Sequence, residues 1–183
     1  MSDQEVLDAI DRAKDGIGKY ILIMDALYAG DVTKNADFQR QYNGLYRVRQ
    51  RKADWYKEYF QLMEESKKDH PSFAKVLRKL KTRLNGAYEP SFCSKLVATI
   101  NPWKPVWDDY VLKNIERKPP SYASSTKHAE AVTCYRSIER WYGRFMRSNE
   151  GRNWVRLFNA NVRDYHKLTD VKKVDFILWQ LRG

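Results

Sequence analysis

The sequence predicts an all-α protein of roughly eight helices, and three observations support this fold class. Apolar residues recur three or four positions apart along almost the whole chain, as on the inner face of a helix. Capping residues and Gly, Pro or Asn breaks separate these stretches. No stretch shows the apolar–polar alternation of a convincing strand. With its 183 residues the chain can bury a sizeable core, so residues 1–183 are predicted to form one domain.

The first half of the chain supplies the first four helices. One begins at the capping box Ser2–Glu5 and carries a long apolar stripe with two glycines inside it. A weaker stripe over residues 38–46 contains Asn43–Gly44, a pair that could form a turn instead. Two clearer stripes follow; Asp54 is expected to cap the first, and His70–Ser72 is expected to start the second.

The last third of the chain is predicted to contain the longest helix, Thr126–Ser148. Before it lies the longest loop, Lys118–Ser125, where two adjacent prolines preclude a regular helix. We expect Asn149–Gly151 to break the long helix. Two more apolar stripes follow, and Thr169 or Asp170 is expected to cap the final one.

The charge balance points to a polyanionic partner. The formal net charge is +11 and the sequence pI is about 9.6. Nucleic acid is the most common partner of such a chain. The alternative is that the charge serves only solubility.

The cysteines and the apolar runs bear on the cellular compartment. Cys93 and Cys134 have neither metal-ligand nor redox spacing, which is typical of reduced, buried thiols in a cytosolic protein. The acidic, amphipathic start differs from a signal peptide, and no apolar run approaches membrane-spanning length. These observations predict a cytoplasmic protein without membrane contact.

The stretch Pro90–Ile115 is predicted to form two short helices joined by a proline-rich turn. Ser91 is expected to cap the first helix, and Asp108 or Asp109 the second. Lys95 lies in the first turns of one helix and Asp108 at the start of the next. The positive end of a helix dipole disfavours an ammonium and favours a carboxylate. A lysine beside an ionised aspartate is a candidate nucleophile with a helper group.

This stretch resembles the active-site segment of the helix-hairpin-helix DNA glycosylases, a superfamily that includes the 8-oxoguanine DNA glycosylases. The matching parts are Ser94–Lys95, the apolar helix Leu96–Ile100, and Pro105–Asp108 with Val111 three residues later. The chain departs from the family pattern at Gly86–Pro90, where the family usually has a Gly-x-Gly hairpin turn. Its spacing from lysine to aspartate is also shorter, and a tryptophan is inserted before the aspartate.

The resemblance implies a catalytic role for two residues. Lys95 would be the nucleophile that forms a Schiff base with C1′ of the sugar. Asp108 would act as acid/base and stabilise the developing charge on the sugar. The alternative for Lys95 is a solvent-facing helix lysine, and for Asp108 a helix cap, a role compatible with catalysis. Asp109 is the competing assignment, but only Asp108 has the valine three residues on.

Two basic segments without acidic residues are candidates for nucleic-acid binding. In residues 38–52 arginines alternate with aromatic residues, which suits phosphate contacts combined with base stacking. A second basic segment covers residues 75–83. The alternative for both is a solvated cationic helix face. The candidate phosphate-binding side chains are Arg40, Arg47, Arg49, Arg51, Lys79 and Arg83.

The end of the chain offers a candidate base pocket. In the resembled glycosylases a C-terminal helix helps to hold the extruded base by stacking and amide hydrogen bonds. Trp179 and Gln180 are the residues that would do so here. The alternative is that the terminal helix belongs to the core.

Several enzyme classes lack their sequence signatures. The three histidines have no metal-ligand spacing, and the chain has no Walker loop, no dinucleotide fingerprint and no nucleophile elbow. We therefore expect no metal and no cofactor. The sequence favours a monomeric, DNA-acting base-excision enzyme of the helix-hairpin-helix glycosylase type. The alternatives are a non-catalytic nucleic-acid-binding protein on the same scaffold and an all-α module that binds another protein.

Overall fold

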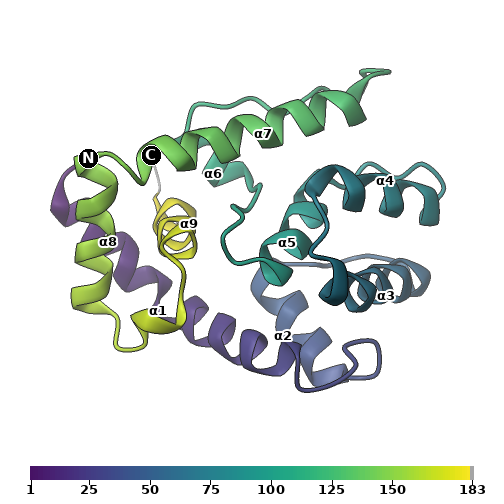
Figure 1. Cartoon of the computed structure of the whole chain (residues 1–183), viewed down its shortest axis with the longest axis horizontal. Helices are drawn as coiled ribbons and strands as arrows, with labels where there is room; N and C mark the ends of the chain where they lie inside the picture. Colours follow the sequence, from purple (N-terminus) through teal and green to yellow (C-terminus); the bar gives the residue numbers. More distant parts are fainter. Residues whose placement is uncertain (182–183) are drawn as a thin grey trace. The chain divides into compact units, whose positions relative to one another are not determined.

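The predicted fold class is confirmed, because the computed structural model is helical throughout and residues 1–181, which it describes, contain no strand. Figure 1 shows the helices in chain order. They are α1 (Asp3–Leu27), α2 (Ala36–Tyr46), α3 (Ala53–Asp69), α4 (Phe73–Arg83), α5 (Pro90–Ile100), α6 (Asp109–Asn114), α7 (Lys127–Phe145), α8 (Asn149–Asn161), the 3₁₀ helix η1 (Tyr165–Lys167) and α9 (Asp170–Gln180).

The helices fall into two compact units. Unit 1 consists of Met1–Asp15 and Pro102–Gly183, described up to residue 181, and unit 2 consists of Gly16–Asn101. The chain passes from one unit to the other within α1 and again after α5. The single domain expected over residues 1–183 stays a prediction.

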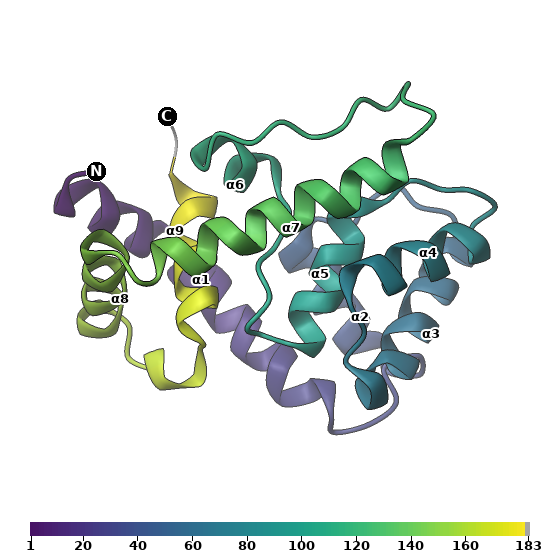
Figure 2. The same ribbon diagram turned by 45° about the horizontal axis from the view of Figure 1, so that its top comes forward.

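Unit 2 is built around α5. Helices α3, α4 and α5 contact one another (Figure 2), and every residue of the range 93–100 is buried. Large aromatic side chains fill the space between α2 and α3, where Tyr42, Tyr59 and Phe60 are almost completely inaccessible to solvent. Unit 2 therefore has an aromatic core of its own beneath the α2–α3 loop.

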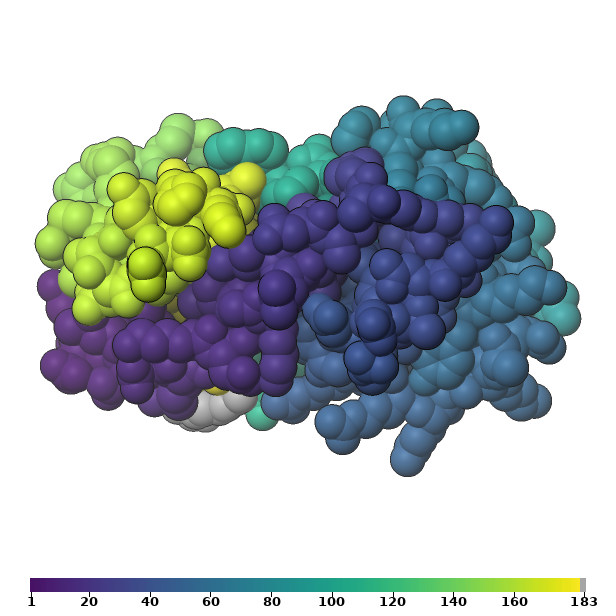
Figure 3. Space-filling view, turned by 90° about the horizontal axis from the view of Figure 1, so that it is seen from below, coloured from purple at the N-terminus to yellow at the C-terminus, as the bar shows by residue number. Residues whose placement is uncertain are grey.

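Unit 1 is built around α9. This helix contacts α6 and α8, and residues 172–178 are all buried. The N-terminal part of α1 lies beside it, as the purple and yellow atoms of Figure 3 show. Arg12 Nη2 donates to the carbonyl oxygen of Gln180 at 3.0 Å. The two ends of the chain thus share one core.

Two helix starts differ from those expected. Helix α3 begins at Ala53, with Lys52 rather than Asp54 in the cap position, and α5 begins at Pro90 rather than after Ser91. Proline fits the first helical position because the amide hydrogen it lacks would have no partner there. The possible turn at Asn43–Gly44 does not form, since both residues lie inside α2.

The corner between α7 and α8 is also different from the prediction. Helix α7 has 19 residues, fewer than the 25 of α1, so it is not the longest helix. The expected break at Asn149–Gly151 is the first turn of α8, which Ser148 caps by accepting from Gly151 N at 3.0 Å. A Cβ atom on Gly151 would lie 2.0 Å from the carbonyl oxygen of Phe145, so the corner requires glycine.

Two further features follow from the helices. No helix in the described part of the chain combines the length and apolar character needed to cross a membrane. Cys93 is buried and Cys134 is half-buried, and both are free thiols. Burial raises the pKa of the Cys93 thiol well above its ordinary value, which makes this side chain an inert part of the core.

Candidate nucleic-acid interface and catalytic residues

The loop between α2 and α3, residues 47–52, is the most cationic connection in unit 2, and we call it the cationic loop. Arg47 and Gln50 adopt left-handed backbone conformations, with φ of 54° and 57°. Non-glycine residues rarely adopt this conformation, and it is common at functional sites. Val48 is buried, and its N–H donates to the carbonyl oxygen of Asn43 at 2.9 Å. The loop therefore has a defined shape with one apolar anchor.

Three cations of this loop face solvent. Arg47, Arg49 and Lys52 are exposed. Within residues 1–181, no ion pair and no side-chain hydrogen bond involves any of the three. Their charges are therefore available to an external anion.

Arg51 has the opposite role and holds the loop against α5. Its guanidinium forms a two-pronged ion pair with Glu89, in which both N–O distances are 3.0 Å. It also lies over the rings of Trp55 and Phe92, with 5.4 Å and 5.1 Å from Cζ to the ring centroids. Burial raises the pKa of Glu89, and the charge of Arg51 partly opposes this shift. Arg51 thus fixes the loop in place, and its expected phosphate contact stays a prediction.

Lys95 lies next to this loop and is buried. Only 5% of the surface of Lys95 is exposed, so the alternative of a solvent-facing helix lysine is wrong. The Nζ atom donates to the carbonyl oxygen of Tyr46, the last residue of α2, at 3.4 Å. It also lies 5.1 Å from the centroid of the Phe92 ring, the same ring that Arg51 covers. Unit 2 therefore brings Lys95 and the cationic loop together.

A chain of tyrosine hydroxyls supports the helix turn that carries Lys95. Tyr59 OH donates to the carbonyl oxygen of Phe92 at 2.8 Å, so Tyr42 OH must be the donor in its 2.7 Å contact with Tyr59. Burial raises the pKa of both tyrosines well above the ordinary value. Both phenols therefore stay neutral and fix the position of α5 through hydrogen bonds.

Asp108 belongs to unit 1, where it caps α6. Its Oδ1 accepts from the N–H of Tyr110 at 3.1 Å, and its backbone is extended, with φ −141° and ψ 153°. The side chain is half-buried, whereas Asp109 is exposed in the first turn of the helix. Asp108 is thus the capping residue of the pair, and its carboxyl group lies at the N-terminal end of α6.

Hydrogen bonds from α7 and α9 fix the segment that leads to Asp108. Tyr135 OH donates to the carbonyl oxygen of Pro105 at 2.8 Å, and Val106 N donates to Asp175 Oδ1 at 3.3 Å. Val106 and Trp107 are buried. The tryptophan inserted before the aspartate therefore belongs to the core of unit 1.

Asp175 is the centre of a buried polar cluster in unit 1. Its Oδ1 accepts from Tyr142 OH at 2.5 Å, and its Oδ2 lies 2.7 Å from Lys172 Nζ. Burial raises the pKa of Asp175, and the charge of Lys172 opposes the shift. Burial, together with the charge of Asp175, raises the pKa of Tyr142 well above its ordinary value. The cluster ties α7 and α9 to the segment before Asp108.

Two candidates in the second basic segment, Lys79 and Arg83, are paired with carboxylates within unit 2, whereas Arg78 and Lys81 of the same segment are exposed. Arg83 Nη2 lies 2.7 Å from Glu65 and its Nη1 lies 3.9 Å from Glu58. Lys79 Nζ lies 4.0 Å from Glu65. These two candidates therefore join α4 to α3 and offer little free charge to a phosphate.

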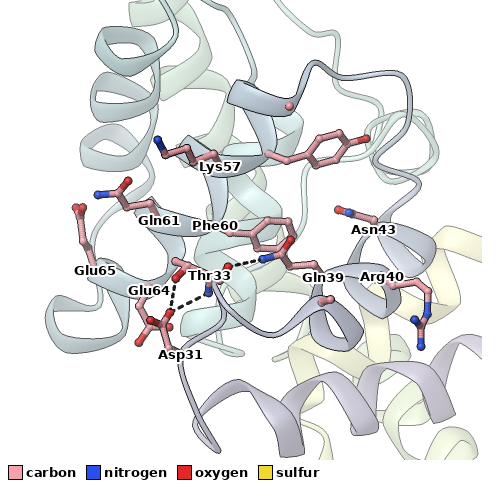
Figure 4. Close-up of a pocket in the computed structure, with 13 residues that line it drawn as sticks. Asp31, Thr33, Gln39, Arg40, Asn43, Lys57, Phe60, Gln61, Glu64 and Glu65 are labelled. Carbon is pink, nitrogen blue, oxygen red and sulfur yellow. Dashed lines mark hydrogen bonds between the residues drawn. The ribbon is translucent and has the colours of Figure 1, made fainter.

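Arg40 borders an open pocket of about 1060 Å³ between α2, α3 and the α1–α2 connection (Figure 4). The guanidinium lies 2.7 Å from Asp37. Carboxylates also line this pocket, at Asp31, Glu64 and Glu65. This negative wall disfavours a phosphate in the pocket.

Trp179 and Gln180 are both half-buried at the end of α9 in unit 1. The Trp179 ring contacts Phe176, with 6.2 Å between the ring centroids. The pockets between α2 and α3, beside α1 and beside α7 are lined by other residues. Their role in base binding stays a prediction.

The sequence did not reveal which cations are paired with a carboxylate, because those carboxylates lie far away along the chain. Glu89 and Glu65 lie 38 and 18 residues from Arg51 and Arg83, too far apart for any local pattern. It also missed three arginines four residues apart in α7, at positions 136, 140 and 144.

Residues 1–181 contain no group of three or more His, Cys, Asp or Glu side chains able to hold a metal. Comparisons with known protein families, curated proteins and solved structures find no match for this chain.

Proposed function

We propose that this protein binds DNA and excises a base, with Lys95 as the nucleophile and Asp108 as the acid/base residue. The observation that carries the proposal is the position of Lys95 in unit 2. Its Nζ contacts the last carbonyl of α2, directly before a loop with three uncompensated cations. A loop of this kind binds a sugar–phosphate backbone, and an amine beside it is close to C1′ of the bound sugar.

The charge distribution supports DNA as the partner. Unit 2 has 16 Lys and Arg against 9 Asp and Glu, so it carries +7 of the formal charge of +11. Arg47, Arg49 and Lys52 are exposed and have no carboxylate partner in the described chain. Neutralising phosphates with such side chains releases counterions, which gives an affinity that falls with salt.

The proposed reaction begins with extrusion of the target nucleotide, because C1′ is inaccessible inside the duplex. The neutral amine of Lys95 forms a bond to C1′ while the glycosidic bond breaks, and the base leaves with the bonding electrons and takes up a proton. Ring opening then moves a proton from the new C1′–N group to O4′ and leaves a Schiff base. Asp108 would stabilise the positive charge that develops on the sugar.

Borohydride trapping on a duplex with an abasic site tests this proposal, because the sugar aldehyde is already free and no base needs to be chosen. Hydride reduces the Schiff base to a stable amine and leaves a covalent protein–DNA adduct. Lys95→Gln should abolish the adduct and retain DNA binding, since the stem remains while the amine is lost. Lys68→Gln is the matched control, because Lys68 is an exposed lysine of the same unit. An adduct that forms equally well in Lys95→Gln would refute the assignment.

The non-catalytic alternative is favoured by the low exposure of Lys95, which is 5%. A nucleic-acid-binding protein on this scaffold would show salt-dependent affinity for duplex DNA without any adduct. A protein-binding module would show neither. The same pair of measurements, binding against salt and trapping, therefore separates all three functions.

A further inference from the structure

Helix α7 of unit 1 presents a solvent-facing stripe without any acidic residue. Its exposed positions recur at helical spacing, and they are Ala129, Thr133, Arg136, Arg140 and Arg144. We call the three arginines the arginine row. Arginines four residues apart are separated by about 6 Å along a helix axis, so the row is a straight line of cations on one face. Figure 2 shows the length of α7 over which this face extends.

The arginine row is not compensated by the carboxylates of its own helix. Glu139 lies 2.8 Å from Lys104, and Glu130 accepts from the Ser124 hydroxyl at 2.6 Å. No ion pair and no side-chain hydrogen bond within residues 1–181 involves the three arginines. This contrasts with Lys79 and Arg83 of unit 2, which have carboxylate partners.

The surface beside the row is concave. Arg136 and Arg140 line an open hollow of about 620 Å³ together with Lys104, Thr133 and Glu139. Glu139 compensates Lys104, so the two arginines give the hollow a net positive charge. A guanidinium binds phosphate oxygens with two parallel hydrogen bonds, and a hollow allows the phosphate to approach from more than one side.

We propose that the arginine row of α7 is a second DNA-backbone contact, and that it binds successive phosphates without reading bases. The proposal rests on DNA being the partner in the proposed function. The exposed positions of α7 include no large apolar side chain, whereas a membrane-binding helix or a protein interface needs one. A line of exposed arginines beside a hollow whose one carboxylate, Glu139, is paired with Lys104 has the chemistry of phosphate binding.

The test compares two triple variants by titrating a fluorescent duplex at several salt concentrations. In Arg136→Gln/Arg140→Gln/Arg144→Gln, the slope of log affinity against log salt should fall by about 2.7, because each phosphate contact contributes about 0.9. Affinity at low salt should fall by at least about tenfold. The control Arg156→Gln/Arg163→Gln/Lys167→Gln removes the same charge from other exposed positions of unit 1 and should change the slope by less than about 1.

Equal losses in the two variants would overturn the inference, because the effect would then be net charge alone. The result is distinguishable from failure of the proposed function. If the row variant has a smaller slope of log affinity against log salt, and the wild-type protein forms no adduct with abasic DNA, the inference is supported and the proposed catalytic role of Lys95 is refuted. A row variant that keeps the wild-type slope, in a protein whose Lys95 traps DNA, refutes only the inference. Circular dichroism of both variants checks that α7 remains folded.

Discussion

Helices α5 and α9 are both largely buried in their units; α5 contains one buried lysine and α9 contains two. In α9, Lys172 and Lys173 lie 2.7 Å and 2.8 Å from Asp175 and Asp170 of the same helix. Helix α5 contains no acidic residue, and Lys95 contacts a backbone carbonyl and an aromatic ring within unit 2. The charges of α9 are thus balanced within the helix, whereas the lysine of α5 is directed to the end of α2.

This difference separates an architectural lysine from a candidate for chemistry. Lys172 and Asp175 stabilise unit 1 only as a pair, since a buried charge without its partner is costly. Lys95 donates to the Tyr46 carbonyl at the end of α2, and it lies beside the exposed cations of the cationic loop. The four predictions below test this contrast in order of decreasing effect.

The largest effect is expected for the buried pair in α9. Lys172→Met should lower the free energy of unfolding by about 3–5 kcal/mol, because Asp175 is left as an uncompensated buried carboxylate. Chemical denaturation measures the loss. Lys172→Met/Asp175→Leu should recover much of it, since the double variant buries no charge. A double variant less stable than the single one would contradict the architectural role.

The next effect concerns the rate of the proposed reaction. Asp108→Asn should slow base release or abasic-site trapping by about 10²–10³-fold, because the amide lacks the charge that stabilises the sugar cation. Stability should change little, since asparagine also caps helices well. Asp109→Asn is the control, because Asp109 is exposed and does not cap α6. Equal rates for the two variants would remove Asp108 from the mechanism.

A smaller effect is expected on stability when Lys95 is replaced. Lys95→Met should lower the free energy of unfolding by about 1–2 kcal/mol at most, because the hydrogen bond from Nζ to the Tyr46 carbonyl is long and methionine keeps most of the buried apolar stem. The measurement is the same denaturation experiment. A loss as large as that of Lys172→Met would show that Lys95 is architectural too.

The smallest effect belongs to an exposed charge in unit 1. Hydrogen bonds from the Ser2 N–H and hydroxyl to Glu5 lower the pKa of this carboxyl below its ordinary 4.5. The stabilisation is therefore present above pH 4.5 and is lost as pH falls through the lowered value. Glu5→Gln should reduce the denaturation midpoint at neutral pH and match wild type in acid. A difference that persists in acid would contradict the capping role.

Local signals in the sequence predicted the helices well. Asp108 and Thr169, each one of two expected candidates, cap their helices, because a side chain that accepts a hydrogen bond from a nearby amide needs no distant partner. The errors arose where packing between helices decides where a helix begins or ends. Gly151 was expected to break a helix, but it allows α8 to approach the end of α7, a contact that sequence spacing does not contain.

The site was predictable only in part, for the same reason. The sequence singled out the basic residues of the cationic loop, and Arg47 and Arg49 are exposed there. It could not separate them from Arg51, which differs only in having Glu89 within reach. The burial of Lys95 depends on α2, about fifty positions earlier, so helix periodicity alone left a surface lysine as an alternative.

The most direct test of the central claim is to locate the covalent bond of the borohydride-reduced adduct. Trypsin cuts after unmodified Lys95 and releases Leu84–Lys95 and Leu96–Lys113, since the bond between Lys104 and Pro105 resists cleavage. A reduced sugar on Lys95 blocks that cut. After nuclease digestion, mass spectrometry should therefore find the fused peptide Leu84–Lys113 with the sugar attached at Lys95. An adduct located at any other amine, with Leu84–Lys95 released unmodified, would contradict the account.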